Sequence, residues 1–500
     1  MKGSRALAFV RTAAMTAVAS LGAGTAVIAP AAAAAGVGVV PFATGHIVVD
    51  QQFPAPTTTA YCEANFGIAC YEPAQLQRAY NLDPLFDRGI TGRGETIVIV
   101  DAFGSPTIAS DLHEFDAAFG LPDPPSLQVI TPEGPITTNS TNCDTATDTC
   151  GDYFGWTDET SLDVEWSHVM APGANILLVE TPMTETEGIY GLPAMMAAEN
   201  YVVDHHLGQV ISQSFGATEQ TFTSPFQILG LRSAYINAAA HGVTVLAASG
   251  DQGATDYYCD PTNAYCGIYS DVACCYATRA IDWPSSDPLV TAVGGTQLQL
   301  DANGKRIAPD SVWDDLSSTV GVPGPVYTWG ASGGGRSTVF SRPYFQDKVS
   351  EIVGGSRGTP DISMSAAVNG AVDFYDTSDP ADAPGWSIVG GTSEASPLFS
   401  GIVALADQMA GHSLGYLNPE LYNLGQRGWG SGIVPVFKGS NSYTFCQASD
   451  VQSDGSCASS SDLVTVPGFS ANGYYNDATG WGTVDAARFV PALAFGGFGH

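Results

Sequence analysis

The feature that most constrains this sequence is the alternation of continuous apolar runs with segments of helical spacing. The apolar runs are rich in β-branched residues, as in strands that are buried on both faces. They occupy residues 96–103, 175–182, 209–216 and 243–251, and helical spacing occurs in 109–120, 193–205 and 231–242. Strands that alternate with helices form a parallel sheet covered on both faces. The sequence therefore predicts an α/β fold of three layers with a mostly parallel central sheet.

The N-terminus has the pattern of a secretory signal. Lys2, Arg5 and Arg11 give a basic start, and an apolar run covers residues 12–28. Small residues follow at 31–36 and would suit cleavage. The run is too short and too rich in Ala, Gly and Thr to favour the alternative of a membrane anchor.

The predicted organisation is a signal peptide at 1–35, a short N-terminal lead at 36–60 and one catalytic domain at 61–500. The sequence shows neither an internal repeat nor a long low-complexity linker. We therefore expect a secreted, extracellular monomer that does not associate with membranes after signal cleavage.

The ten cysteines fall into local groups, as expected for disulfides that close short loops in an exported protein. The groups are Cys62/Cys70, Cys143/Cys150, Cys259/Cys266/Cys274/Cys275 and Cys446/Cys457. A metal site is the weaker interpretation, because neither CxxC pairs nor clustered histidines accompany them. The pairing within the group of four stays open.

The charge balance excludes two classes of protein. The chain has 17 Lys+Arg against 50 Asp+Glu, yet only 13% of its residues are charged and 44% are hydrophobic. A disordered acidic tail would have far fewer apolar residues, and a nucleic-acid binder would need basic patches. The acidity favours tolerance of low pH, although acidic surfaces also serve solubility alone.

The first segment with candidate chemistry is 390–397 (GGTSEASP), where small residues surround Ser393 just before an apolar helical run. A serine at a helix start lies near backbone N–H donors and the positive end of the helix dipole. Ser393 is therefore a candidate nucleophile. The alternative is an ordinary N-cap.

The second segment is 158–174, a predicted helix in which Leu162, Trp166 and Val169 form one buried face. Glu159 and Asp163 lie one turn apart on a neighbouring stripe, where like charges destabilise a helix slightly. Either these acids form a solvated face, or they belong to a site.

The third segment is 247–254 (AASGDQGA), which ends a very apolar strand with Asp251 between glycines. Such an aspartate commonly bonds to its own turn. It could instead face a site beyond the carboxyl ends of the strands, where functional residues of parallel sheets gather.

Together these segments resemble the sedolisin family, the serine-carboxyl peptidases. Further matching motifs in the same order extend the resemblance over nearly the whole chain after the signal; they are 97–112, 210–220, 283–296 and 332–345. The resemblance implies a subtilisin-like fold. It also implies that Ser393 is the nucleophile, Glu159 its general base, Asp163 the residue that orients Glu159, and Asp251 the oxyanion-hole partner.

An acidic base suits catalysis at low pH. At pH about 4 a histidine of pKa near 6.5 is protonated, and freeing it costs roughly 3.4 kcal/mol. A glutamate remains partly ionised there and can accept the proton of a serine. Asp251 has the opposite task, because it must stay protonated to donate a hydrogen bond to the oxyanion.

The segment 210–216 is expected to line the substrate channel through Ser214 and Gly216, by pairing with an extended substrate backbone. Gly333 and Gly334 of the SGGG motif are expected on the other side of the channel. The alternative for these glycines is a requirement for tight turns.

The sequence departs from the family at two places. Only a short lead separates the signal from the first family-like segment, whereas family members usually carry a long folded pro-region. The family's calcium site also looks degenerate, because Pro435 and Asn476 stand where aspartates are expected, with Lys438 nearby. We expect no metal there, and a Cys446–Cys457 bridge in its place.

The sequence thus predicts a secreted serine-carboxyl endopeptidase that cleaves polypeptides at acidic pH; tripeptidyl-peptidase action remains possible. One alternative is a catalytically inactive binding module on the same scaffold. Another is a histidine-dependent subtilisin, suggested by 100–104 (VDAFG), but none of the eight histidines opens a glycine-rich helix. A glycosidase would not explain the setting of Ser393.

Overall fold

The computed structural model describes residues 40–41, 52–139, 149–182, 191–256, 275–315, 330–378, 385–446 and 463–496. Residues 35–500 form one compact unit, to which all of these belong. The predicted signal, Cys143, Cys259, Cys266, Cys274 and Cys457 lie outside the described residues, as do the side chains of Cys150 and Cys446. Within the described ranges, no helix combines the length and apolarity needed to cross a bilayer.

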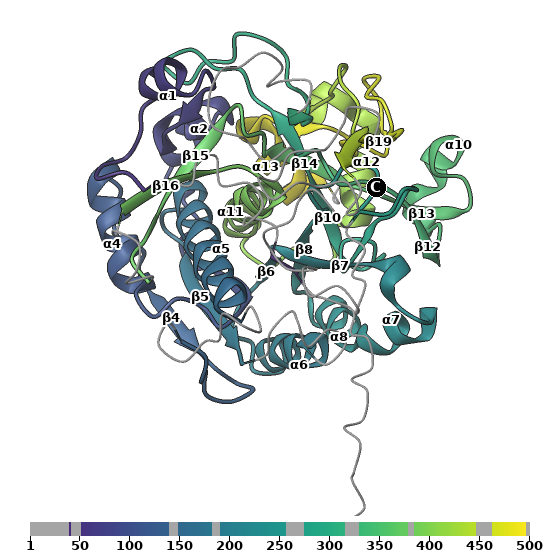
Figure 1. The fold of residues 1–500 in the computed structure, drawn as a ribbon, viewed down its shortest axis with the longest axis horizontal. Helices are drawn as coiled ribbons and strands as arrows, with labels where there is room; N and C mark the ends of the chain where they lie inside the picture. Colours follow the sequence, from purple (N-terminus) through teal and green to yellow (C-terminus); the bar gives the residue numbers. More distant parts are fainter. Residues whose placement is uncertain are drawn as a thin grey trace, which may run out of the picture. The chain divides into compact units, whose positions relative to one another are not determined.

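A central sheet of eight strands forms the core of the fold (Figure 1). All of its pairs are parallel except the one between its edge strand β11 and β10. In spatial order the strands are β11 (Ser311–Val312), β10 (Thr291–Gln297), β8 (Thr244–Ala248), β6 (Val210–Gln213), β3 (Thr96–Ala102), β5 (Asn175–Thr181) and β4 (Leu127–Ile130); β14 (Ile362–Ser365) pairs with β10. The predicted parallel sheet is confirmed.

Alternate side chains of the central strands enter two separate hydrophobic cores. Ile97 and Ile99 of β3 pack in one core, whereas Val98 and Val100 pack in the other. The first core also holds apolar side chains of α4 (Ile108–Phe119), α5 (Thr149–Met170), α11 (Thr392–Ala410) and α13 (Ala486–Phe495). The second holds those of α6 (Gly191–Asp204), α7 (Pro225–Leu231) and α8 (Ser233–His241). Helices therefore cover both faces of the sheet, as the continuous apolar strands predict.

The remaining elements are short. They are α1 (Thr59–Asn65), β2 (Cys70–Tyr71), α2 (Pro73–Ala79), α3 (Asp83–Phe86), β12 (Gly335–Ser341), α10 (Ser350–Val353), β13 (Ser356–Thr359), β15 (Ala371–Asp376), β16 (Gly385–Val389), α12 (Asn418–Arg427), β17 (Ile433–Val434), β18 (Tyr443–Cys446), β19 (Leu463–Val466) and β20 (Thr483–Val484), with 3₁₀ turns at Glu219–Thr221, Tyr344–Val349 and Gly428–Ser431.

The segment 209–216 differs from its expected single strand. β6 ends at Gln213, and a separate strand, β7 (Phe215–Thr218), leaves the central sheet. β7 lies between β1 (Val40–Pro41) and β9 (Asp282–Trp283) in a small antiparallel sheet. The break places Ser214 at the carboxyl end of β6, between the two sheets.

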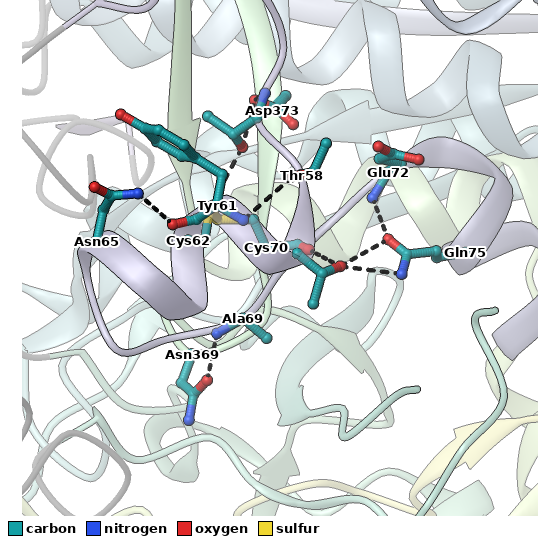
Figure 2. The surroundings of a disulfide bond; sticks show 12 residues. Thr58, Tyr61, Cys62, Asn65, Ala69, Cys70, Glu72, Gln75, Asn369 and Asp373 are labelled. Carbon is teal, nitrogen blue, oxygen red and sulfur yellow. Dashed lines mark hydrogen bonds between the residues drawn. A yellow bond between two sulfur atoms is a disulfide. The ribbon is translucent and has the colours of Figure 1, made fainter. Parts of the chain in front are cut away.

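The domain begins to pack before residue 61. Phe53 is buried and bridges to Trp386, and the Thr57 backbone N–H donates to Asp373 at 2.9 Å. The expected disulfide between Cys62 and Cys70 is present and ties α1 to β2 (Figure 2). The later part of the predicted lead is therefore built into the catalytic domain.

Helix α5 packs closely on α11 near the middle of the molecule (Figure 1). The Ser167 and Ser400 hydroxyls lie 3.1 Å apart across this contact. A Cβ atom on Gly401 would lie 2.4 Å from the Met170 Cβ atom and 3.2 Å from the Ser167 carbonyl oxygen. Glycine at 401 therefore allows the two helices to approach.

We expect Gly401→Ala to lower the free energy of unfolding by about 1–3 kcal/mol, because the added methyl group overpacks the contact between α5 and α11. Gly230→Ala is the matched control, since nothing lies within 4 Å of its Cβ position on α7. There the better helix propensity of alanine should stabilise the protein by roughly 0.5–1 kcal/mol. Urea unfolding measures both; equal effects at the two sites would contradict the packing argument.

Candidate active site

Glu159 and Asp163 lie on α5 and are fully buried. The solvated-face alternative is therefore wrong. Leu162, Trp166 and Val169 are buried as predicted, but the opposite side of the helix is buried as well, because other elements, α11 among them, cover it.

Asp163 accepts a hydrogen bond from Ser214, whose Oγ atom lies 2.7 Å from its Oδ1 atom. Burial raises the pKa of Asp163 well above its usual value, and the nearby charges of Glu159 and Asp101 raise it further. The Ser214 hydrogen bond lowers this pKa, but has the smallest effect of the four. Ser214 thus binds Asp163 of α5 through its side chain, and the expectation that its backbone lines the substrate channel stays a prediction.

Asp101 is a third buried acid at this place, at the end of β3. Its Oδ2 atom accepts a hydrogen bond from Thr160 Oγ1 at 3.0 Å. Burial raises its pKa to about 7, and the charge of Glu180 on β5 raises it as well. The sequence signal was an aspartate ending an apolar strand, which had suggested only a resemblance to subtilisins.

Ser393 lies in the first turn of α11 and is fully buried. The N-cap position belongs to Gly391, so the N-cap alternative for Ser393 is wrong. Within the described part of the chain, no hydrogen-bond partner reaches the Ser393 Oγ atom. Its hydroxyl group is thus not committed to a structural bond there.

Asp251 lies directly beside the start of α11. Its Oδ1 atom accepts hydrogen bonds from the Thr392 backbone N–H at 2.8 Å and from the Thr392 hydroxyl at 2.5 Å. The carboxyl group therefore reaches from the end of β8 to the residue before Ser393, and does not act only within its own turn.

Two serines at the carboxyl end of β6 contact the two helices α11 and α5. Ser212 on β6 contacts Ser396 of α11, with the hydroxyl oxygens 2.8 Å apart, and Ser214 binds Asp163 of α5. Ser393 lies about one helical turn before Ser396, and Glu159 one turn before Asp163. The structure thus gathers the four predicted catalytic residues at the carboxyl end of the central sheet.

The predicted substrate-binding residues separate into two groups. Gly216 lies on β7 and pairs with Val40 of β1, so an extended antiparallel strand occupies this edge. Gly333 and Gly334 instead donate their backbone N–H groups to the carbonyls of Gly250 and Gly253, at 2.7 and 3.1 Å.

The carbonyls of these two glycines are also bonded, to Ser249 Oγ at 2.7 Å and to Asn441 Nδ2 at 3.3 Å. A Cβ atom on Gly333 would collide with the Ser249 carbonyl oxygen. Gly333 and Gly334 therefore support the Asp251 loop, and their backbone groups are not open to a substrate strand.

The six histidines of the described ranges make contacts away from Ser393. His168 is buried and bonds the Pro122 carbonyl at 2.7 Å, with Asp116 at 3.3 Å. The others bond or stack with near neighbours, namely His113 with Asp123, His205 with Tyr201, His206 with His241, and His412 with the Ser413 carbonyl. This arrangement offers no histidine base from the described residues.

Several groups at the family's expected calcium site are absent or already bonded, and the expected lack of a metal there stays a prediction. Pro435 has no side-chain oxygen, and Asn476 Oδ1 accepts from the backbone N–H groups of Ala478 and Thr479 at 3.1 and 3.0 Å. Asp477 forms an ion pair with Arg336 at 2.9 Å. Across the described ranges, no three His, Cys, Asp or Glu side chains are grouped to hold a metal.

Comparison with known families agrees with this geometry. A model of the subtilase family matches residues 145–420, more than half of the chain. The chain belongs to the subtilase family. The matched range contains all four predicted catalytic residues.

Two curated relatives refine this assignment. Kumamolisin from Bacillus sp. (strain MN-32) is 31% identical over 389 residues, which cover 76% of this chain and 58% of kumamolisin. Sedolisin from Pseudomonas sp. (strain 101) is 28% identical over 410 residues, which cover 82% of this chain and 60% of sedolisin. The resemblance to the sedolisin family is confirmed, and the chain spans about three fifths of the length of these relatives.

A solved structure of Pseudomonas sedolisin, described as a serine-carboxyl proteinase complexed with two molecules of pseudo-iodotyrostatin, matches with a TM-score of 0.63. The match covers 86% of this chain and 100% of that chain at 24% identity. It confirms the subtilisin-like fold.

We expect the buried acids to make the folded state more stable in acid. The pKa of Asp101 lies at about 7 in the folded state against about 3.9 unfolded, so its stabilising contribution is complete below pH ~4 and is lost as pH rises through 7. Thermal unfolding between pH 3 and 9 should show a falling midpoint, and Asp101→Asn should flatten that fall.

Glu133→Gln is the control, because Glu133 is exposed and its removal changes the charge alone. Identical pH dependence of the wild type and of Asp101→Asn would contradict this account.

Proposed function

We propose that this protein is a serine peptidase that hydrolyses peptide bonds at acidic pH with Ser393, Glu159 and Asp163 as its triad. The observation that carries the proposal is the placement of an unbonded, buried serine hydroxyl at the same sheet edge as two buried carboxyl groups of α5. Membership of the subtilase family and the likeness to kumamolisin and sedolisin support it.

In the proposed reaction, Glu159 removes the proton of Ser393 as the serine oxygen attacks the substrate carbonyl carbon. Glu159 then gives this proton to the leaving amine, and an acyl-enzyme remains. Water, deprotonated by Glu159, attacks the acyl group and releases the second product. Asp163 orients Glu159 throughout and is itself held by Ser214.

Asp251 is the proposed oxyanion partner. Its Oδ1 atom is bonded by Thr392, so this carboxyl group lies next to the residue that attacks. A carboxyl group donates a hydrogen bond only when it is protonated. This requirement, with the use of a glutamate as the base, favours operation in acid.

The proposed substrates are extended polypeptides that add to β7. The antiparallel pairing of Val40 and Pro41 with Gly216 and Phe215 supports this proposal, because an extended strand of the same chain already pairs with β7 there. A strand of this kind can pair with any extended backbone, which favours endopeptidase action. Release of tripeptides would need an additional barrier that stops the substrate three residues before the cleaved bond.

The predicted signal and the cysteine groups support a secreted enzyme, with the Cys62–Cys70 bridge as one disulfide. We place it outside the cell as a monomer. The alternative of an inactive binding module rests on the departures at the lead and at the calcium site.

We expect Ser393→Ala and Glu159→Gln each to reduce turnover of an unfolded protein at pH 3–5 by roughly 10²–10⁴-fold, because one removes the nucleophile and the other the base. Glu114→Gln on the exposed side of α4 is the matched control and should retain full activity. Equal, negligible turnover by the wild type and both variants would favour the binding module. Fragments identified by mass spectrometry would separate endopeptidase from tripeptidyl products.

Asp251→Ala should cost about 100- to 1000-fold in kcat through loss of an oxyanion donor. Asp251→Asn should lose less, since its amide group donates at any pH, and the variant should keep more of its activity as pH rises. The measurement is kcat against pH for the three proteins. Equal loss in both variants would show that Asp251 acts by structure alone.

A further inference from the structure

A second pair of buried carboxyl groups lies behind the Asp251 loop. Asp282 on β9 is 1% exposed and Asp256 is 2% exposed, and their side chains are hydrogen-bonded to each other. An ionised carboxylate only accepts hydrogen bonds, so a bond between two carboxyl groups requires that one of them carry a proton. A hydrogen bond between Asp282 and Asp256 therefore implies that the two carboxyl groups share one proton.

Both carboxyl groups pack against Gly250, the residue before Asp251. A Cβ atom at 250 would lie 2.5 Å from Asp282 Oδ2 and 2.8 Å from Asp256 Oδ2. Gly250 also has a φ of +100°, which favours glycine. The turn that presents Asp251 thus rests directly on the acid pair.

The pair also connects the turn to the substrate edge. Asp282 pairs with Thr218 of β7 in the small sheet and accepts a hydrogen bond from the Thr218 side chain. From the turn, the Gly250 backbone N–H donates to Thr392 Oγ1 at 3.2 Å, next to Ser393. A displacement of Gly250 would therefore also shift Asp251, Ser393 and β7, which are the proposed oxyanion partner, nucleophile and substrate-binding strand.

Within the described part of the chain, the charges that raise the pKa of Asp282 are those of Asp256 and Asp251. Burial raises its pKa well above the usual value, and the charge of Asp256, their mutual hydrogen bond and the charge of Asp251 raise it further. Two arginines of the described ranges are bound to other groups: Arg232 to Asp287 at 2.5 Å, and Arg279 to the carbonyls of Pro467 and Gly468 at 2.8 and 3.1 Å. Without their proton, the two aspartates would face each other as buried like charges.

We propose that Asp282 and Asp256 are positioning residues for the peptidase reaction, whose shared proton holds the Gly250–Asp251 turn against β7. When the pair loses that proton at higher pH, repulsion opens the contact, the turn shifts and activity falls. This inference rests on the proposed function, and it adds a second group of acids, apart from the triad, whose proton contributes with that of Asp251 to the upper pH limit of activity.

The test is Asp282→Asn, which keeps the shape and can donate to Asp256 without a titrating proton. Its kcat at acidic pH should stay near that of the wild type, while the pH at which kcat falls to half should rise by about one unit or more. Asp282→Ala should lower kcat at every pH with little change in KM, because it removes the contact altogether. Glu351→Gln, at an exposed acid of α10, is the control for loss of one charge.

Thermal unfolding against pH provides a readout that does not need activity. Because the folded-state pKa of Asp282 is raised, its contribution to stability is complete at low pH and is lost as pH rises through that pKa, and Asp282→Asn should flatten this loss. If Asp282→Asn does not fold, Asp256→Asn makes the same test from the other side of the bond.

The proposal is wrong if the folded Asn variant shows the same pH dependence of kcat and of the unfolding midpoint as the wild type. If the wild-type protein has no peptidase activity, the proposed function fails. The unfolding curves then still decide whether the pair shares a proton.

Discussion

Carboxyl groups that are buried away from solvent are the constraint on which the rest of this structure depends. The chain has 50 acidic residues and 17 basic ones, and its buried aspartates Asp287, Asp310, Asp361 and Asp477 already take four of the arginines. Asp163 of α5, Asp101 of β3 and Asp282 of β9 instead bond to hydroxyl groups and lie near other acids. Such groups are stable in a protein interior when they are protonated. A fold built this way is expected to be more stable in acid than at neutral pH.

Much of the site could be predicted because parallel strands carry their functional residues to one edge. Ser393, Asp251 and the acids of 158–174 are far apart in sequence, but each follows or faces the carboxyl end of a strand. Spacing alone could not decide whether Glu159 and Asp163 are solvated. The apolar stripe at Leu162, Trp166 and Val169 marks one buried face, whereas the burial of the other face depends on packing by elements such as α11, more than 200 residues later in the chain.

The features that were missed all depend on contacts between distant segments. Gly333 and Gly334 looked like open strand edges, but their backbone groups bond to the Asp251 loop. Asp101 had suggested only a resemblance to subtilisins, and its place beside the acids of α5 became visible through its contacts with Thr160 and Asp163. The disulfide of Cys62 and Cys70 was predictable because it is a local contact. Its two cysteines are only eight positions apart in the sequence, so a short loop brings them together.

The position of Val40–Pro41 has a consequence for any competition assay. β7 has a neighbour on each side, β1 and β9, so an added strand must displace one of them. Because β1 belongs to the same chain, its local concentration at β7 is set by the length of the connecting segment and is unaffected by dilution. A free peptide that pairs with β7 must therefore compete with a strand of the same chain. A single cut between residues 41 and 52 would remove this advantage of β1, because β1 could then diffuse away from β7.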